Sequence, residues 1–436
     1  MMGRTVHIGV VVASLAASAA IASSAGLAGG TAPVRPVRTE TEIRELDISF
    51  FQTRAERDPH GASDRAQLGR LYLHRARETG SHGDLVRAEE TARESLAIRR
   101  GRNGAAYAIL ASSLMAQHRF PEALDAARRL LATDSASVAA RAMVGEIELE
   151  LGRYQEARRT FGMLATRRAD PSVAPRLARW EELRGRPEAA RALLREARDR
   201  IRRTHAVPKE QLAWFQLRLG DLALRHGRLD EAAAELKAGR DLSPDDYRLL
   251  GAAARLALVR GDPRESRVLG ERAIARTLDP GILATLYDAS VALGDSAAAA
   301  QYFRAMAVAV LAQPGALHRG WSGFLLDHHR DIAAVLERAR AELASRRDVY
   351  GWDLFAWALH RSGRHAEATE AMTHALALGT RDAVLRYHAG RIALAAGDSA
   401  DARTHLQAAL EISAYWHPTQ PAEARALLDS LGGPVS

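Results

Sequence analysis

Histidine is the residue type whose distribution along this chain could support chemistry. Of 16 histidines, nine fall between His318 and His417. Imidazole binds transition metals and titrates near neutral pH, so this clustering is consistent with a metal or pH-sensing site. No two of the nine stand four residues apart, the spacing of a helical chelate, although His360 and His365 flank one predicted turn. We keep binding of a metal or small ligand by these C-terminal His-rich repeats as an alternative function, and assign no metal ligand.

Other catalytic patterns are missing from the sequence. There is no cysteine, which excludes disulfides, thiol nucleophiles and Cys-ligated metals. Neither of the two lysines follows a phosphate-binding glycine pattern, and no HExxH or GxSxG motif occurs. The adjacent acids Glu181-Glu182 and Asp245-Asp246 are typical of a solvated helix face or a helix N-terminus. We therefore predict no enzymatic activity, no catalytic residue and no cofactor.

The charge balance does not point to nucleic acid. Lysine and arginine total 61 against 53 acidic residues, a net charge of +8, and all the basic residues except Lys209 and Lys237 are arginine. Such an arginine preference resembles the codon usage of a GC-rich bacterium. The arginines alternate with acids, and no run of basic residues with interleaved aromatics appears. We predict no nucleic-acid partner.

The N-terminal residues have the pattern of an export signal. Arg4 is followed by an apolar stretch from Val6 to Ala22, and then by small residues suited to a signal peptidase. We expect residues 1–25 to be a signal peptide, residues 26–40 a flexible linker, and the protein to be periplasmic or secreted. The alternative is an uncleaved inner-membrane anchor at residues 6–28, and only then would the membrane be a partner.

A glycine followed by a polar residue recurs along the chain at a nearly constant interval. The spacings of these pairs are 33, 42, 34, 33, 69 and 34 residues, and 69 is about two periods. The same interval places two further turns at His118 and at His328-His329, and histidine tolerates the left-handed conformation better than most residues. The glycine pairs are Gly152-Arg153, Gly185-Arg186, Gly227-Arg228, Gly261-Asp262, Gly294-Asp295, Gly363-Arg364 and Gly397-Asp398.

Small residues repeat in phase with these turns. Seven residues before the nine turns, seven positions hold Gly or Ala, as at Ala111, Gly145 and Gly220. Five residues after most turns a small residue returns, as at Ala157 and Ala232. Such spacing on both sides of a turn predicts two amphipathic helices packed closely and antiparallel, repeated as a solenoid.

These motifs resemble those of the tetratricopeptide repeat family. The similarity is clearest in Trp352 to Leu359 with Gly363 to Ala368, and in Leu219-Gly220 with Gly227 to Ala232. The resemblance implies an all-α, right-handed superhelical solenoid of antiparallel helix pairs. We expect an N-terminal helix in residues 41–62, repeats in 63–203 and 209–415 separated by a loop at 204–208, and a C-terminal capping helix and tail in 416–436.

The resemblance also implies a concave groove that binds a segment of another protein. Its groove column corresponds to the residue six before each turn, and neighbouring inner positions add further side chains, Arg176 and Arg248 among them. A central arginine-rich part would hold carboxylates, and a C-terminal aromatic part would anchor a partner, unless its rings pack in the core instead. We predict a non-catalytic scaffold of the bacterial cell envelope with a protein or peptide partner, or alternatively a structural subunit of an envelope assembly. The candidate groove residues are Arg179, Arg218, Asp221, Arg225, Arg255, Asp288, Trp357, His360, Tyr387, His388 and Arg391.

Overall fold

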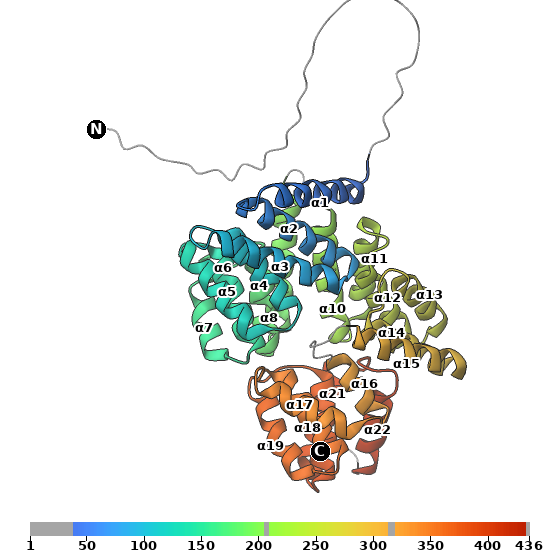
Figure 1. Cartoon of the computed structure of the whole chain (residues 1–436). Helices are drawn as coiled ribbons and strands as arrows, with labels where there is room; N and C mark the ends of the chain where they lie inside the picture. Colours follow the sequence, from blue (N-terminus) through green and yellow to red (C-terminus); the bar gives the residue numbers. More distant parts are fainter. Residues whose placement is uncertain (1–37, 205–208, 313–318, 433–436) are drawn as a thin grey trace, which may run out of the picture. The chain divides into compact units, whose positions relative to one another are not determined.

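The chain is an all-α helical-repeat solenoid, as the turn spacing predicts (Figure 1). The computed structural model describes residues 38–204, 209–312 and 319–432, and within these ranges there are 22 α-helices, one 3-10 turn and no strand. The expected signal peptide, most of the expected linker and residues 205–208 of the expected loop lie outside the described residues. None of the described helices combines the length and apolar character needed to cross a bilayer.

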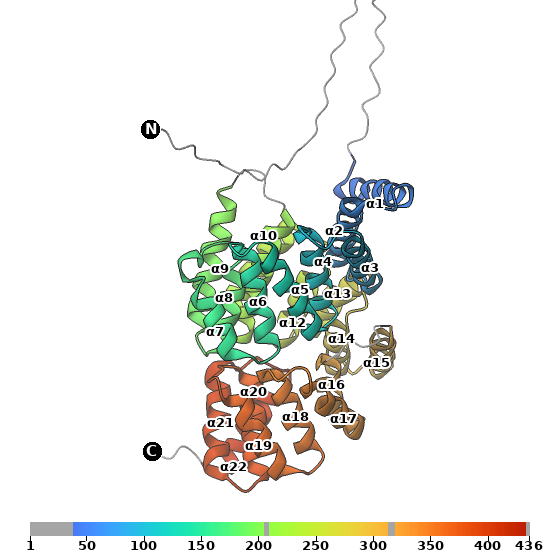
Figure 2. The ribbon, with the colours of Figure 1, turned by 60° about the vertical axis from the view of Figure 1, so that its left-hand side comes forward.

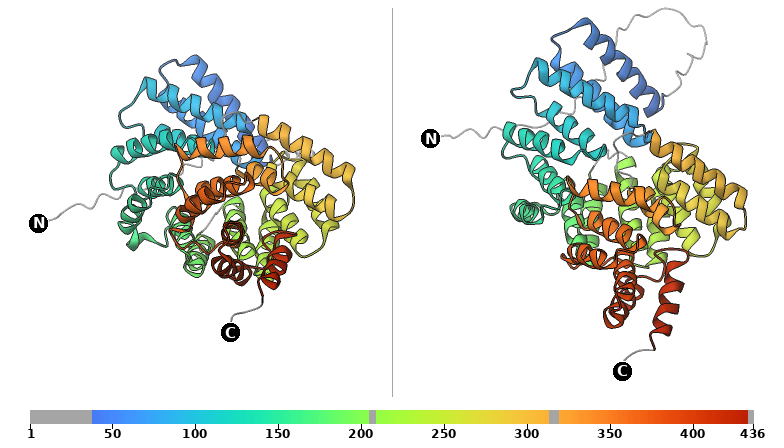
Figure 3. Two further views of the ribbon diagram at one scale, coloured as in Figure 1. Left: turned by 90° about the horizontal axis from the view of Figure 1, so that it is seen from below. Right: turned by 60° about the horizontal axis from the view of Figure 1, so that its bottom comes forward.

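The helices follow one another as hairpins, which Figure 3 traces by colour from blue to red. Their bounds are α1 Glu40–Arg57, α2 Ala62–Thr79, α3 His82–Ile98, α4 Gly104–Ala116, α5 Phe120–Thr133, α6 Val138–Glu150, α7 Tyr154–Gly162, α8 Ala174–Leu183, α9 Pro187–Arg202, α10 Lys209–Arg225, α11 Leu229–Leu242, α12 Tyr247–Val259, α13 Pro263–Ile274, α14 Pro280–Ala292, α15 Ser296–Leu311, α16 Arg319–Asp327, α17 Ile332–Leu343, α18 Val349–Arg361, α19 His365–Leu376, α20 Ala383–Ala395, α21 Ser399–Ile412 and α22 Gln420–Ser430.

The predicted turns are confirmed by their backbone conformation. At Gly152, φ is +73°, and the amides of Gly152 and Arg153 donate to the carbonyl oxygens of Leu149 (3.0 Å) and Glu148 (2.8 Å). This is the Schellman arrangement, in which a left-handed residue satisfies the last free carbonyls of a helix. The other six predicted glycines also have positive φ, and so do His118 (+59°) and His329 (+54°).

The small residues before the turns allow the two helices of a hairpin to touch. A Cβ added at Gly220 would lie 2.8 Å from two carbon atoms of Leu236, and one at Gly390 would lie 2.7 Å from Leu406. In each case the contacted leucine follows the glycine by 16 residues, which is the same position in both repeats. The core is therefore built between the helices of each pair and against the next pair.

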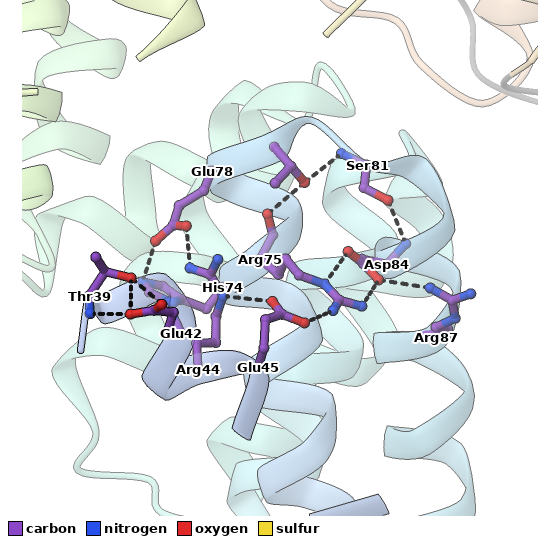
Figure 4. Close-up of polar contacts among 11 residues, drawn as sticks. Thr39, Glu42, Arg44, Glu45, His74, Arg75, Glu78, Ser81, Asp84 and Arg87 are labelled. Atoms are coloured by element: carbon purple, nitrogen blue, oxygen red, sulfur yellow. Dashed lines mark hydrogen bonds and ion pairs between the residues drawn. The ribbon is translucent and has the colours of Figure 1, made fainter. Parts of the chain in front are cut away.

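An ion-pair network joins helices α1, α2 and α3 at the start of the array (Figure 4). Arg75 on α2 donates to both carboxylate oxygens of Asp84 at 2.8 Å and to Glu45 on α1 at 2.5 Å. Asp84 is buried in the first turn of α3, where its own amide donates to the Ser81 hydroxyl. Burial alone would raise the pKa of Asp84, but its bonds to Arg75 and Arg87 outweigh burial and hold that pKa below its ordinary value.

Within the unit from Arg44 onward, segments about 195 residues apart also touch. The amide of Val349 donates to the Tyr154 hydroxyl at 2.7 Å, and the Thr380 hydroxyl donates to the Leu183 carbonyl at 2.5 Å. The Thr277 hydroxyl likewise donates to the Thr79 carbonyl at 2.7 Å. Figure 2 shows α18–α21 beside the ends of α6–α9, where two of these bonds lie. The chain therefore packs against helices that lie about six repeats earlier in its sequence.

Candidate functional site

The predicted aromatic anchors near the C-terminal end lie in the packed interior. Trp357 is 2% exposed and Tyr387 is 1% exposed. The Trp357 ring is stacked against His360 and His388, with centroids 4.9 and 4.2 Å away, and its indole N–H donates to Asp327 at 3.1 Å. Core packing, the alternative interpretation of these rings, is the one that their burial favours.

The polar residues beside these rings also have internal partners. Buried His388 lies with its Nδ1 atom 2.9 Å from Asp353. Tyr387 donates its hydroxyl hydrogen to Glu423 on α22 at 2.7 Å, and Arg391 donates to that same hydroxyl oxygen at 2.7 Å. The contacts among Tyr387, Arg391 and Glu423 attach the last helix to α20. They leave little of the predicted C-terminal patch for a partner.

Titration in this region follows from the same burial. Burial and, to a lesser extent, the charge of Arg391 lower the pKa of His360 to about 3, so this imidazole is neutral at physiological pH. Burial would also lower the pKa of His388, but the charge and hydrogen bond of Asp353 outweigh it and raise that pKa. Farther along the predicted groove column, half-buried Asp288 lies 3.5 Å from His328. The described residues contain no group of three His, Asp or Glu side chains able to hold a metal ion.

The arginine-rich part of the predicted groove is brought together around one carboxylate. Glu182 on α8 accepts hydrogen bonds from Arg225 on α10 at 2.5 and 2.9 Å and from Arg179 at 3.2 Å. Burial would raise the pKa of Glu182, but Arg225, Arg179 and Arg218 together lower it to about 2. Arg218, one helical turn from Asp221, has no carboxylate within ion-pair distance in the described part of the chain.

Arg255 extends this group from α12. It is exposed, and its guanidinium donates to the carbonyl oxygen of Trp416 at 3.3 Å. Desolvation by the surrounding protein nevertheless lowers the pKa of Arg255, opposed by the charge of half-buried Asp221. Arg255 is therefore accessible to water although protein atoms lie close to it.

A later part of the solenoid completes this group. The Tyr350 ring at the start of α18 lies with its centroid 5.1 Å from the Arg179 guanidinium, a cation–π contact. The Tyr350 hydroxyl points to Asp382, the N-cap residue of α20, at 3.4 Å. Burial raises the pKa of Tyr350, so the phenol stays protonated. Tyr350 lies beside Arg179, and Asp382 beside Tyr350, because α18–α21 pack against helices of earlier repeats.

A second group of arginines comes from α2, α8 and α12. Arg176 on α8 pairs with Glu146 at 2.6 Å, while Arg248 on α12 pairs with Asp246 at 2.6 Å. Arg77 on α2 is exposed and has no carboxylate partner among the described residues. Burial lowers the pKa of Arg77, and the charges of Arg176 and Arg248 lower it further, so the three positive charges repel one another.

Sequence reasoning placed Arg176 and Arg248 at inner positions but missed Arg77. The first helix of the first repeat, α2, ends at Gly80 in an irregular turn that is off the 34-residue lattice, and so no groove position was assigned in this repeat. Arg77 also lines a cavity of about 350 Å³ together with Ser112 and Tyr247. We name as the arginine face the following seven residues: Arg77, Arg176, Arg179, Arg218, Arg225, Arg248 and Arg255.

The arginine face can bind carboxylates. Its guanidinium groups are suited to bidentate hydrogen bonds, and the partners already present are carboxylates such as Glu182 and Asp246.

Two segments of the chain match the model of a known repeat family. A family model described as tetratricopeptide repeat matches residues 110–174 and 217–281. Among solved structures, the chain is similar to the APC/C hetero-tetramer Cut9-Hcn1 (13% identity over 90% of this chain and 94% of that one, TM-score 0.35). It is also similar to yeast Tom70 (12% identity, 90% and 92%, TM-score 0.34) and to the TPR domain of P58(IPK) (15%, 86% and 99%, TM-score 0.25). No curated protein sequence matches the chain.

Proposed function

We propose that this tetratricopeptide-type protein is a non-catalytic scaffold whose arginine face binds an extended acidic segment of a partner protein. The observation that carries the proposal is the state of Arg77 and Arg218. The charges of other arginines lower the pKa of each, and neither has a carboxylate within ion-pair distance among the described residues. Repulsion between neighbouring guanidinium groups would be relieved by carboxylates supplied from outside.

The composition of the face favours a protein segment over nucleic acid. Glu146, Glu182 and Asp221 alternate with the arginines and would repel a dense line of phosphates. A segment carrying a few separated carboxylates could instead reach the arginines and avoid these acids. Tyr350 adds a half-buried ring next to Arg179, against which an apolar side chain of the segment could pack.

The cell envelope is the proposed location of this interaction. The support is the sequence pattern of residues 1–25, a short basic start, an apolar stretch and small residues. Immunoblotting of fractionated cells tests this point: the chain should be found in the periplasm or medium and be shorter by about the length of the leader. A full-length chain in the cytoplasm contradicts this location without affecting the binding proposal.

Fluorescence anisotropy tests the binding. The probe is a labelled peptide of Gly, Ser and spaced Glu, and the reference is the same peptide with Gln at each Glu. We expect the Glu peptide to bind more tightly, and Arg218→Gln or Arg77→Gln to weaken its binding about tenfold each, since a charge-assisted hydrogen bond contributes roughly 1.5–3 kcal/mol.

The matched control is Arg129→Gln on α5, an exposed arginine paired with Asp125 at 2.8 Å and outside the arginine face. It should bind the Glu peptide as the unmodified chain does. Equal affinity for the two peptides, or an equal loss in the Arg129 variant, contradicts the proposal.

A further inference from the structure

Helix α15 has an exposed face made mainly of apolar residues. Its 16 residues include a single charged side chain, Arg304. Apart from Ser296 and Gln301, the exposed positions are Ala297, Ala300, Arg304, Val308 and Leu311, which are spaced by three, four, four and three residues and so lie along one face of the helix. Val308 is 61% exposed and Leu311 is 79% exposed.

The equivalent helix of a later repeat shows what an ordinary solvent-facing side looks like. On α19 the exposed positions include Glu367, Thr369, Glu370, Thr373 and His374, all polar. Polar residues are expected wherever water covers a helix, because apolar surface left in water forgoes about 25 cal/mol for each Å². A contiguous apolar face is therefore a sign of an interaction surface, unlike single exposed apolar residues.

Within the described ranges, α15 packs on α14 and has no helix packed along it on the side of the following repeat. In the preceding and following repeats, α13 packs along α14 and α17 packs along α18. In the described part of the chain, α15 and α16 make no comparable contact, and they meet where Phe303 approaches the rings of Trp321 (5.5 Å) and Phe324 (6.2 Å). A cavity of about 420 Å³ opens here, lined mainly by apolar side chains of α14 and α15, including Val291 and Ala300.

Two arginines without acidic partners border this cavity. Arg304 projects from α15, and Arg330 follows α16 with its guanidinium 4.5 Å from the centroid of the Phe303 ring. Neither has a carboxylate within ion-pair distance in the described ranges. An occupant of the cavity with its own carboxylate would therefore complement the charge.

We propose that the open face of α15 binds an amphipathic helix of another protein, with its apolar side against Ala300, Val308 and Leu311 and an acidic residue near Arg304 and Arg330. The spacing of three and four residues suits a helix as the occupant, and the alanines allow close approach of its backbone. This surface is separate from the arginine face, so it stands or falls independently of the proposed acidic-segment site.

Site-specific photo-crosslinking in the producing cells tests the proposal. A photoreactive phenylalanine derivative replaces Leu311 in the full-length chain, and the matched control carries it at Thr373, an exposed position of α19. We expect one dominant adduct from position 311 but not from position 373. Mass spectrometry should locate the crosslink in a helical segment of a second protein, with an acidic residue within one or two turns of it.

Charge exchange then tests the mode of binding with purified proteins. Arg304→Glu should weaken binding of the mapped segment at least tenfold, and exchanging the segment's acid for arginine should restore most of the affinity. Val308→Glu should weaken binding too, and both variants should keep the melting temperature of the unmodified chain because the two positions are exposed.

Four results would overturn the proposal. These are equal adducts at positions 311 and 373, an adduct with a phospholipid, an adduct with residues 1–37 or a second copy of this chain, and binding that is indifferent to Arg304→Glu.

Discussion

The contact between repeats that lie far apart in the sequence leads to a specific prediction about two glycines. Gly152 and Gly294 occupy the same position in their repeats, with φ of +73° and +74°. Alanine at either position must adopt a left-handed conformation, which costs roughly 1–2 kcal/mol. At Gly294 nothing else lies within 4 Å of the added Cβ. Gly294→Ala should therefore lose only this conformational free energy.

At Gly152 the same methyl group meets another part of the chain. Its Cβ would lie 2.2 Å from the carbonyl oxygen of Arg347 and 2.5 Å from the carbonyl carbon. Both atoms belong to backbone, so they cannot rotate away, and the two segments must separate. Separation strains the nearby hydrogen bond from the Val349 amide to Tyr154, 2.7 Å long. Overpacking and this bond together add about 1–3 kcal/mol, for a total loss of about 2–5 kcal/mol.

Two measurements check this prediction. Urea unfolding followed by circular dichroism should show a larger loss for Gly152→Ala than for Gly294→Ala. Hydrogen exchange should show faster exchange of the Val349 amide in Gly152→Ala, and no change there in Gly294→Ala. Equal unfolding midpoints with unchanged protection of Val349 would refute the packing of residues near 347 against the turn at Gly152.

Two further predictions concern packing and pH. Gly220→Ala should destabilise the chain by about 1–2 kcal/mol, because the added methyl group meets Leu236. The control is Gly323→Ala in helix α16, where nothing lies within 4 Å of the added methyl group, and this variant should be more stable by up to about 1 kcal/mol. Thermal melts measure both changes. The raised pKa of His388 predicts that its pairing with Asp353 contributes most below pH 6.5 and is lost as pH rises through the folded-state pKa. The stability gap between the unmodified chain and His388→Asn should accordingly narrow on going from acidic to alkaline pH, and a gap that is constant or widens would contradict this assignment.

Some of the candidate site could be predicted from the repeat and some could not. The spacing of Arg179, Arg218 and Arg225 relative to their turns was enough to place them on one side of neighbouring helices, and they do surround Glu182. The repeat position of Trp357 gave no information on its burial, because a ring at that position can point into the groove or lie against the next hairpin. Which of these occurs depends on the neighbours that pack beside it.

The local structure of this protein is determined by its sequence. Glycine and histidine at turn positions permit the left-handed conformation, and small residues such as Gly220 let two helices meet, so hairpins and their order follow from residue type and spacing. Only the tertiary structure decided which distant hairpins meet, as Tyr154 meets Val349, and which arginines influence each other, as Arg248 lowers the pKa of Arg77. The physical reason is that such contacts depend on the summed rotation of about six repeats. Small differences in helix packing accumulate over that length, and no local pattern of residues records the sum.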